Sequence, residues 1–144
     1  METIERTLSI DAKELYFSAA HYIPNHPQCG KLHGHTYFVK NLRIVAKGLV
    51  DFGDLKKAIK TFDHCTLVPK KHADEWDKIY TRLVVEKSPI ADVFSNIIPI
   101  RDTDLPGTTV ERIAEALREE FHRIPGVVEV HFTLTEGPTA GRQV

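Results

Sequence analysis

Residues 110–136 contain two adjacent segments whose apolar residues recur with different spacing. In VERIAEALREEFHRI, residues 110–124, apolar side chains recur every three to four positions, which predicts an amphipathic helix with Thr108 or Thr109 as its N-cap. In VVEVHFTLTE, residues 127–136, apolar and polar residues alternate, which predicts a half-buried strand. Such a helix and such a strand bury their apolar surfaces by packing together. The sequence therefore predicts an α+β fold in which helices cover a sheet.

The rest of the chain supplies further elements of both kinds. Residues 7–22 are expected to be mostly extended, and a second strand is expected over residues 32–45, after a loop that contains Asn, Pro and Gly. DFGDLKKAIKTF, residues 51–62, has apolar residues at helical spacing and predicts a short amphipathic helix. The stretch 79–100 contains two β-branched runs around Lys-Ser-Pro, which indicates a hairpin. We expect one domain over residues 1–144.

The composition narrows the class of function. With 42% apolar and 27% charged residues the chain resembles an ordinary globular protein, and its formal net charge of −1 with scattered basic residues disfavours nucleic-acid binding. The first residues carry charges every few positions, so we expect neither a secretion signal nor a membrane span. We therefore expect a cytoplasmic protein. Two cysteines do not make a disulfide framework.

The segment CGKLHGHTY, residues 29–37, carries the strongest chemical signal. His33 and His35 are two residues apart on a predicted strand, so their side chains project to the same side. His21, on the preceding strand, reaches the same point if the two strands pair. Three neutral imidazoles suit Zn²⁺ and leave a fourth coordination position for water or substrate, as in catalytic sites. A pair of histidines in this spacing also occurs in unrelated metal-binding folds.

A closed structural site is the alternative for the same residues. The Cys29 thiolate would then be a fourth zinc ligand beside the three histidines. Against this, the sequence has no second Cys-x-x-Cys or Cys-x-x-His unit, and a domain of this length does not need a zinc ion to fold. The other histidines considered are expected at the surface or paired with a neighbour: His26, His72, His122 and His131.

Several motifs occur in an order that resembles the 6-pyruvoyltetrahydropterin synthase superfamily. They are FSAAH, CGKLHGHTY, VDFGDLKK, FDH, TTVERIA and LTE, and they extend from Leu15 to Glu136 with an insertion at about residues 69–105. Three residues separate Cys29 from His33, which resembles the 6-carboxytetrahydropterin synthase branch. The pyruvoyl-forming enzymes usually have a longer spacer at this place.

The resemblance implies roles for individual residues. His21, His33 and His35 match the zinc ligands of the family, and Cys29 matches its catalytic thiol, a proton-transfer base. A nearby divalent cation lowers the pKa of a thiol, which favours the thiolate. Asp63 and His64 match an Asp-His pair that handles protons on the other side of the substrate, often from a neighbouring subunit.

The resemblance also implies a binding pocket for the pterin ring. Glu136 matches the glutamate that anchors the pterin, since a carboxylate accepts two parallel hydrogen bonds from the ring N–H and the exocyclic amine. Thr109 and Glu111 match the segment that lines the pocket, although a glutamate in a first helical turn also complements the helix dipole. Cys65 has no motif role and is expected to be packed. Candidates for binding a triphosphate are Lys31, Lys70, Lys71 and Arg101.

The implied fold is the tunnelling fold, with an antiparallel four-stranded sheet, two helices on one face and, here, an inserted hairpin. Subunits of this family form trimeric barrels that stack as hexamers, and exposed edge strands favour such assembly. The implied reaction is the zinc-dependent conversion of 7,8-dihydroneopterin triphosphate to 6-carboxy-5,6,7,8-tetrahydropterin, with release of acetaldehyde and triphosphate, in the pathway to 7-deazaguanine nucleosides such as queuosine or archaeosine. Alternatives are pyruvoyl formation from the same substrate and a non-catalytic zinc-stabilised binding module.

Overall fold

The fold is built on one six-stranded sheet, which the computed structural model describes for residues 4–10, 15–105 and 107–137. The long third strand pairs antiparallel with the first, second and sixth strands, which confirms the expected four-stranded antiparallel sheet. The fourth and fifth strands extend this sheet beside the second strand. The strands are β1 Glu5–Ile10, β2 Tyr16–His21, β3 His33–Lys47, β4 Cys65–Pro69, β5 Ile97–Ile100 and β6 Val127–Glu136.

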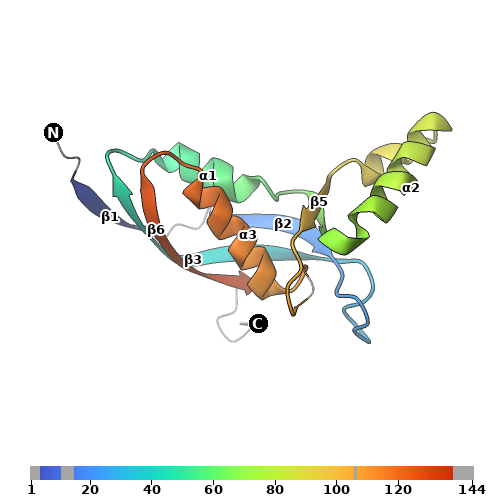
Figure 1. The fold of residues 1–144 in the computed structure, drawn as a ribbon, viewed down its shortest axis with the longest axis horizontal. Coiled ribbons are helices and arrows are strands. Elements are labelled where there is room, and N and C mark those ends of the chain that lie inside the picture. The colour runs from blue at the N-terminus through green and yellow to red at the C-terminus, as the bar shows by residue number, and fades with distance from the viewer. Residues whose placement is uncertain (1–3, 11–14, 106, 138–144) are drawn as a thin grey trace.

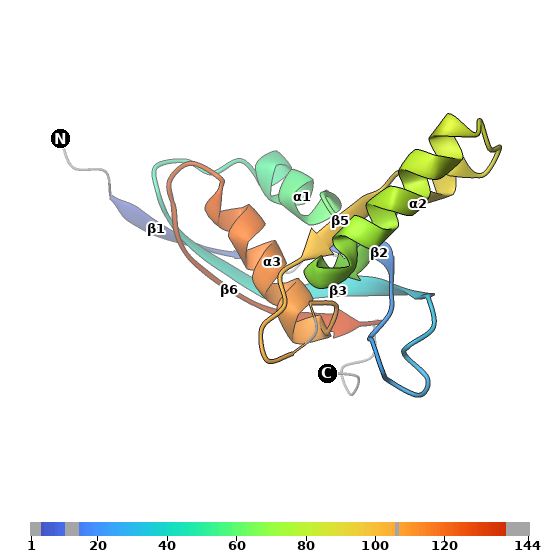
Figure 2. The same ribbon diagram turned by 45° about the vertical axis from the view of Figure 1, so that its right-hand side comes forward.

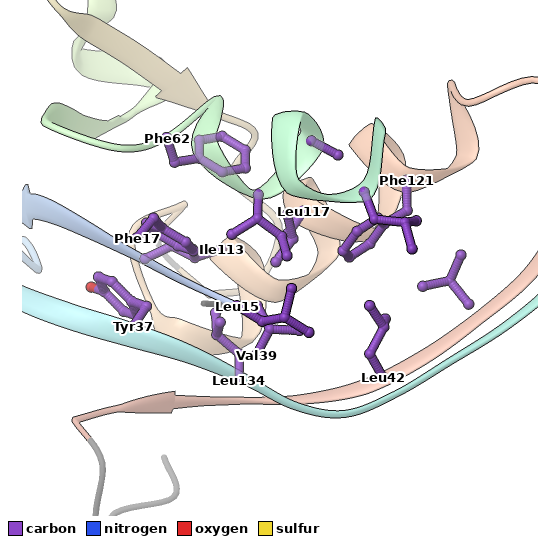
Figure 3. Packing of buried hydrophobic residues seen from close by; sticks show 14 of the residues in the cluster. Leu15, Phe17, Tyr37, Val39, Leu42, Phe62, Ile113, Leu117, Phe121 and Leu134 are labelled. Carbon is purple, nitrogen blue, oxygen red and sulfur yellow. The ribbon is translucent and has the colours of Figure 1, made fainter. Parts of the chain in front are cut away.

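Two helices, α1 Phe52–Lys60 and α3 Val110–His122, lie over the same face of this sheet (Figure 1). The Asp51 carboxylate caps α1 by accepting a hydrogen bond from the backbone N–H of Gly53 at 2.9 Å. Both helices turn an apolar stripe toward the strands, as their periodicity predicts. Figure 3 shows the resulting core, in which side chains of both helices meet those of β2, β3 and β6.

The expected hairpin over residues 79–100 is wrong. The structure has a helix, α2 Ala73–Val85, followed by a short 3-10 turn and β5. Figures 1 and 2 show α2 leaning away from the rest of the molecule, and none of its residues is buried. Because α2 connects β4 to β5, the two strands run parallel, as a helical crossover requires. Within the described residues the protein therefore has three α-helices rather than the expected two, and β4 and β5 join the four antiparallel strands in one sheet instead of forming a separate hairpin.

Strand alternation decides which residues reach the functional site. In β2, Phe17 and His21 face the helices, whereas Ser18 faces away from them. In β3, His35 and Tyr37 share the helix-covered face, because each is paired with a residue of β2 that has the same orientation. The sheet therefore has one face that holds the core and three histidines, and an opposite face with different polar groups.

None of the helices in the described part of the chain is long and apolar enough to span a membrane.

Candidate metal centre and active site

Three histidine side chains meet at the end of the helix-covered face of the sheet. His21 of β2 is the direct cross-strand partner of His33 of β3, and His35 follows two residues later on the same face. The ring centroids are 4.6 Å apart for His21 and His33, 5.0 Å for His21 and His35, and 4.8 Å for His33 and His35. One nitrogen of each ring lies within 4.8 Å of the other two. We call these three residues the histidine cluster.

Two backbone carbonyls fix the tautomers of two rings of the cluster. His21 Nδ1 lies 2.8 Å from the carbonyl oxygen of Thr108, and His33 Nδ1 lies 2.6 Å from that of Lys31. Because a carbonyl oxygen only accepts hydrogen bonds, each Nδ1 carries the proton and donates it. Each Nε2 therefore keeps its lone pair, which is how protein histidines are prepared to bind a metal.

Burial favours the neutral form of two of the three rings, His21 and His35. Burial lowers the pKa of His21 to about 4, against the opposing effect of the Thr108 hydrogen bond and with help from nearby His33 and His35. Burial also lowers the pKa of His35, although the Glu136 carboxylate acts in the opposite direction. A neutral imidazole is the form that binds a cation, since protons and metals compete for the same lone pair.

The chemistry of the cluster fits a metal ion. His21 is 1% exposed, and its Nε2 is buried without a hydrogen-bond partner among the described residues. An unpaired buried acceptor is unfavourable, and a cation would satisfy it. Three imidazole nitrogens suit Zn²⁺ and related transition ions. The Cys29 thiol is not among the groups close enough to share the ion with the cluster in the described structure.

Glu136 and Tyr37 border the cluster on the side of β6. The two residues are cross-strand partners, so their side chains share the face of the cluster. The Glu136 carboxylate lies 3.6 Å from His35 Nε2. Tyr37 is fully buried, and burial together with nearby Glu136 raises the pKa of its hydroxyl above the usual range. The carboxylate expected to anchor a pterin ring is thus placed directly beside the expected metal ligands.

Cys29 lies in the loop that connects β2 to β3, and its side chain is half-buried. Its N–H donates to His26 Nδ1 at 2.9 Å, and its carbonyl accepts from the N–H of Ile23 at 2.6 Å. A Cβ at Gly30 would approach the carbonyl oxygen of His26 to 2.5 Å, so this close turn requires glycine. These contacts fix the backbone of Cys29, which lies between His21 and His33 in the sequence.

The Asp-His pair, Asp63 and His64, lies between the end of α1 and the start of β4. His64 Nδ1 lies 3.0 Å from Asp63 Oδ2, and Asp63 Oδ1 accepts from the N–H of Ser18 at 2.8 Å. Partial burial opposes ionisation of Asp63, but the hydrogen bonds from Ser18 and His64 outweigh it and hold the pKa of the carboxyl below its usual range. The His64 side chain is 83% exposed. A carboxylate in this position fixes the orientation of the imidazole.

His64 lines a hollow of about 430 Å³ together with His35 and with Ser18 and Thr36, whose side chains alternate to the face of the sheet opposite to the histidine cluster. Ser18 and Thr36, whose hydroxyl oxygens are 3.1 Å apart, form part of its floor. His64 adopts a φ of 60°, in the left-handed region, and its N–H donates to the carbonyl of Ser18 at 2.6 Å. Such backbone geometry in a non-glycine residue often accompanies functional sites. Within one chain, the hydroxyl floor beside His64 and the side chains of the histidine cluster thus lie on different faces of the sheet.

The start of α3 reaches the cluster through Thr108. This residue is fully buried, and its hydroxyl donates to the carbonyl of Tyr22 at 2.5 Å while its own carbonyl holds His21. Thr109 occupies the N-cap position of α3, as expected, but its side chain makes no capping hydrogen bond. Glu111 lies exposed in the first turn, where it complements the helix dipole.

Comparison with known proteins identifies the family. Residues 11–143 match 6-pyruvoyl tetrahydropterin synthase. The chain belongs to this family. A protein of Methanocaldococcus jannaschii named "Putative 6-carboxy-5,6,7,8-tetrahydropterin synthase" is 31% identical over 69% of this chain and 67% of its own length. A protein of Pyrococcus abyssi with the same name is 28% identical over 89% of this chain and 84% of its own.

A solved structure supports the fold of this family member. A catalytic-residue mutant of 6-pyruvoyltetrahydropterin synthase from Plasmodium vivax superposes with a TM-score of 0.53, at 18% identity, over 94% of each chain. Together with the antiparallel sheet and the helices on one face, this confirms the expected tunnelling fold. The added β4–α2–β5 crossover occupies the place of the expected hairpin.

Sequence reasoning missed three contributors to this site. The Thr108 and Lys31 carbonyls act through the backbone, so their residue types carry no signal. Tyr37 belongs to the quoted HGHTY segment, and alternation alone could have placed it on the histidine face. Cys65, by contrast, is packed against the core as expected, and burial, with nearby Asp63, raises the pKa of its thiol.

Proposed function

We propose that this protein is a zinc-dependent, cytoplasmic lyase that converts 7,8-dihydroneopterin triphosphate to 6-carboxy-5,6,7,8-tetrahydropterin, releasing acetaldehyde and triphosphate, on the route to 7-deazaguanine nucleosides. Membership of the family supports a pterin substrate. The names of the two archaeal relatives and the short spacer between Cys29 and His33 favour the carboxy product over the pyruvoyl product. The observation that carries the proposal is the histidine cluster with the carboxylate of Glu136, the expected pterin anchor, at its border.

The histidine cluster would hold the zinc ion through His21, His33 and His35. A bound zinc would act as a Lewis acid toward oxygen atoms of the substrate side chain. Two of the ligand rings are oriented before the metal binds, because the Thr108 and Lys31 carbonyls hold them in the tautomer that binds a metal.

Glu136 would bind the pterin ring through two parallel hydrogen bonds and so align the side chain of the substrate with the cluster. Cys29, in the loop that precedes β3, would accept a proton from that side chain. Asp63 would orient His64, which would take or return a second proton from the opposite side. Lys31, one of the four triphosphate candidates, adjoins the cluster through its backbone carbonyl, which accepts from His33 Nδ1.

The opposite orientation of the two groups favours an oligomeric enzyme. Ser18 and Thr36, which form the floor beside His64, lie on the face of the sheet opposite to the cluster, so His64 of one subunit would act on a substrate held by another. We propose the homohexamer of the family, a dimer of trimers. Mixing inactive Cys29→Ala and His64→Ala proteins after mild dissociation should restore part of the activity in hybrid oligomers, and no recovery would place both groups in one subunit's site.

Product analysis tests the reaction. The purified protein, loaded with zinc, is incubated with 7,8-dihydroneopterin triphosphate, and the pterin product is identified by mass together with an acetaldehyde assay. The proposal predicts carboxytetrahydropterin and acetaldehyde in equal amounts. A pyruvoyl product without acetaldehyde would identify the alternative reaction of the same family.

A cysteine variant separates catalysis from structural zinc binding. Cys29→Ala should keep its zinc content and melting temperature while turnover falls by at least about 100-fold, which is typical of losing a proton-transfer group. Cys65→Ala is the matched control, because Cys65 is a second half-buried thiol and has no proposed role in the reaction. Loss of zinc from Cys29→Ala would instead support the non-catalytic binding module.

A further inference from the structure

Two buried side-chain polar atoms in the described residues have no hydrogen-bond partner, and they belong to neighbouring side chains. They are His21 Nε2 and the hydroxyl of Tyr37, whose rings are 5.9 Å apart. A metal ion bound by the histidine cluster would satisfy the first atom. The second is a hydroxyl that still needs an acceptor, because Tyr37 is 0% exposed.

Packing does not explain why this position carries a hydroxyl. The Tyr37 ring stacks on Phe17 with centroids 4.9 Å apart and an interplanar angle of 17°, contacts that a phenylalanine ring would make equally well. Figure 3 shows the Tyr37 oxygen pointing away from the apolar cluster, away from Val39 and Leu134. Removing an unsatisfied buried hydroxyl normally leaves stability unchanged or improves it. The hydroxyl therefore calls for a functional partner.

Glu136 is the acceptor that shares this face. It is the cross-strand partner of Tyr37, and its carboxylate is oriented toward His35 at 3.6 Å. A carboxylate that binds a pterin through two parallel hydrogen bonds uses only part of its acceptor capacity, since its two oxygens offer about four lone-pair sites. At neutral pH a tyrosine hydroxyl carries its proton and can donate to one of the remaining sites.

We propose that Tyr37 is a positioning residue for pterin binding: its hydroxyl donates a hydrogen bond to the Glu136 carboxylate when that carboxylate engages the ring of the ligand. This inference rests on the proposed function, because it takes the ligand of Glu136 to be a pterin. Tyr37 acts through Glu136, and so it sets the affinity for the ring without taking part in metal binding or proton transfer.

Tyr37→Phe tests the proposal, because it keeps the ring and removes only the hydroxyl. Binding of 7,8-dihydroneopterin, which lacks the triphosphate, is measured by calorimetry, together with zinc affinity by chelator competition and the melting temperature. We expect the dissociation constant for the pterin to rise about tenfold or more, as for a hydrogen bond to a charged group. Zinc affinity should not change, and the melting temperature should stay equal or rise. Tyr16→Phe, which removes a half-exposed hydroxyl from the neighbouring strand, is the control and should bind normally.

A double variant tests the route through Glu136. In the Glu136→Gln background the acceptor is neutral and weaker, so adding Tyr37→Phe should change pterin affinity much less than in the wild type. An equal factor in both backgrounds would mean that the hydroxyl contacts the ligand directly, and would overturn the proposal. Unchanged affinity of Tyr37→Phe, or a lowered melting temperature that accompanies its loss of affinity, would overturn it as well. If the wild-type protein binds no dihydroneopterin, the proposed function itself fails and this inference with it.

Discussion

Acidification should destabilise the metal-free protein through His21. Its pKa is about 4 in the folded chain, against 6.5 for an ordinary histidine. Between these values the unfolded chain holds a proton that the folded chain lacks, so stability rises with pH across this window. Above about pH 6.5 both states are neutral and the full stability is present, and below about pH 4 the whole contribution is lost.

The size of the effect follows from the same two values. At about 1.36 kcal/mol per pKa unit, they correspond to about 3 kcal/mol of unfolding free energy between pH 6.5 and pH 4. This is a large share of the 5–15 kcal/mol, roughly, by which domains are usually stable. His35, whose pKa burial also lowers, adds to the dependence in the same direction.

Urea unfolding followed by circular dichroism, in the presence of a chelator, measures this dependence. The wild-type midpoint should fall steadily as the pH is lowered from about 6.5 toward 4, and His21→Asn, which does not titrate, should show a much flatter curve. His131→Gln is the control, because this histidine is exposed beside Glu129, and it should keep the wild-type curve. An equally steep curve in His21→Asn would refute the assignment of the effect to this buried ring.

Three further substitutions test parts of the structure away from the reacting groups or beside them. Tyr22→Phe removes the oxygen that accepts from Trp76 Nε1 at 2.9 Å and contacts His72 Nδ1 at 2.8 Å. Hydrogen exchange in α2 should accelerate, with a loss of about 1–2 kcal/mol in the stability of this helix against local unfolding. Unchanged protection would show that other contacts hold α2. Gly107→Ala places a Cβ against the carbonyl oxygen of Ile100 and should displace the Thr108 carbonyl. Zinc affinity, measured by chelator competition, should then fall at least about tenfold. Unchanged affinity would mean that this carbonyl does not orient His21. Asp63→Asn should lower kcat more than KM and shift the acid limb of the pH profile, whereas a change in KM alone would assign the pair to binding.

The sequence could predict the histidine cluster because one local rule governs it. Residues two apart on a strand share a face, and the loop after β2 returns the chain as an antiparallel neighbour, so His33 and His35 had to meet His21 if the register was right. The observed pairing of His21 with His33 is that register. The amphipathic helices over residues 52–60 and 110–122 were equally predictable from their apolar stripes.

Within the insertion, α2 was harder to predict because none of its residues is buried. Periodicity signals the burial of one face, and α2 contains no buried residue, so the β-branched residues near its end suggested strands. The better signals were the charges, since Asp74 and Glu75 lie in the first turn and Arg82 in the last, as the helix dipole favours. The contact between His21 and Thr108 joins residues 87 positions apart and uses a carbonyl, which no residue pattern encodes.

The position of the site follows from where the helices stop covering the sheet. Along β2 the inward positions run from Phe17, in the core, to His21, and the start of α3 meets His21 through Thr108. Inward positions under the helices must be apolar to build the core, but those at its border can be polar if each group finds a partner. Here the partners are a carbonyl for one nitrogen of His21 and, by our proposal, a metal for the other and Glu136 for the Tyr37 hydroxyl. Ligands that pair these polar atoms would bind the folded chain and not the unfolded one, and so metal and pterin should each raise the melting temperature of this protein.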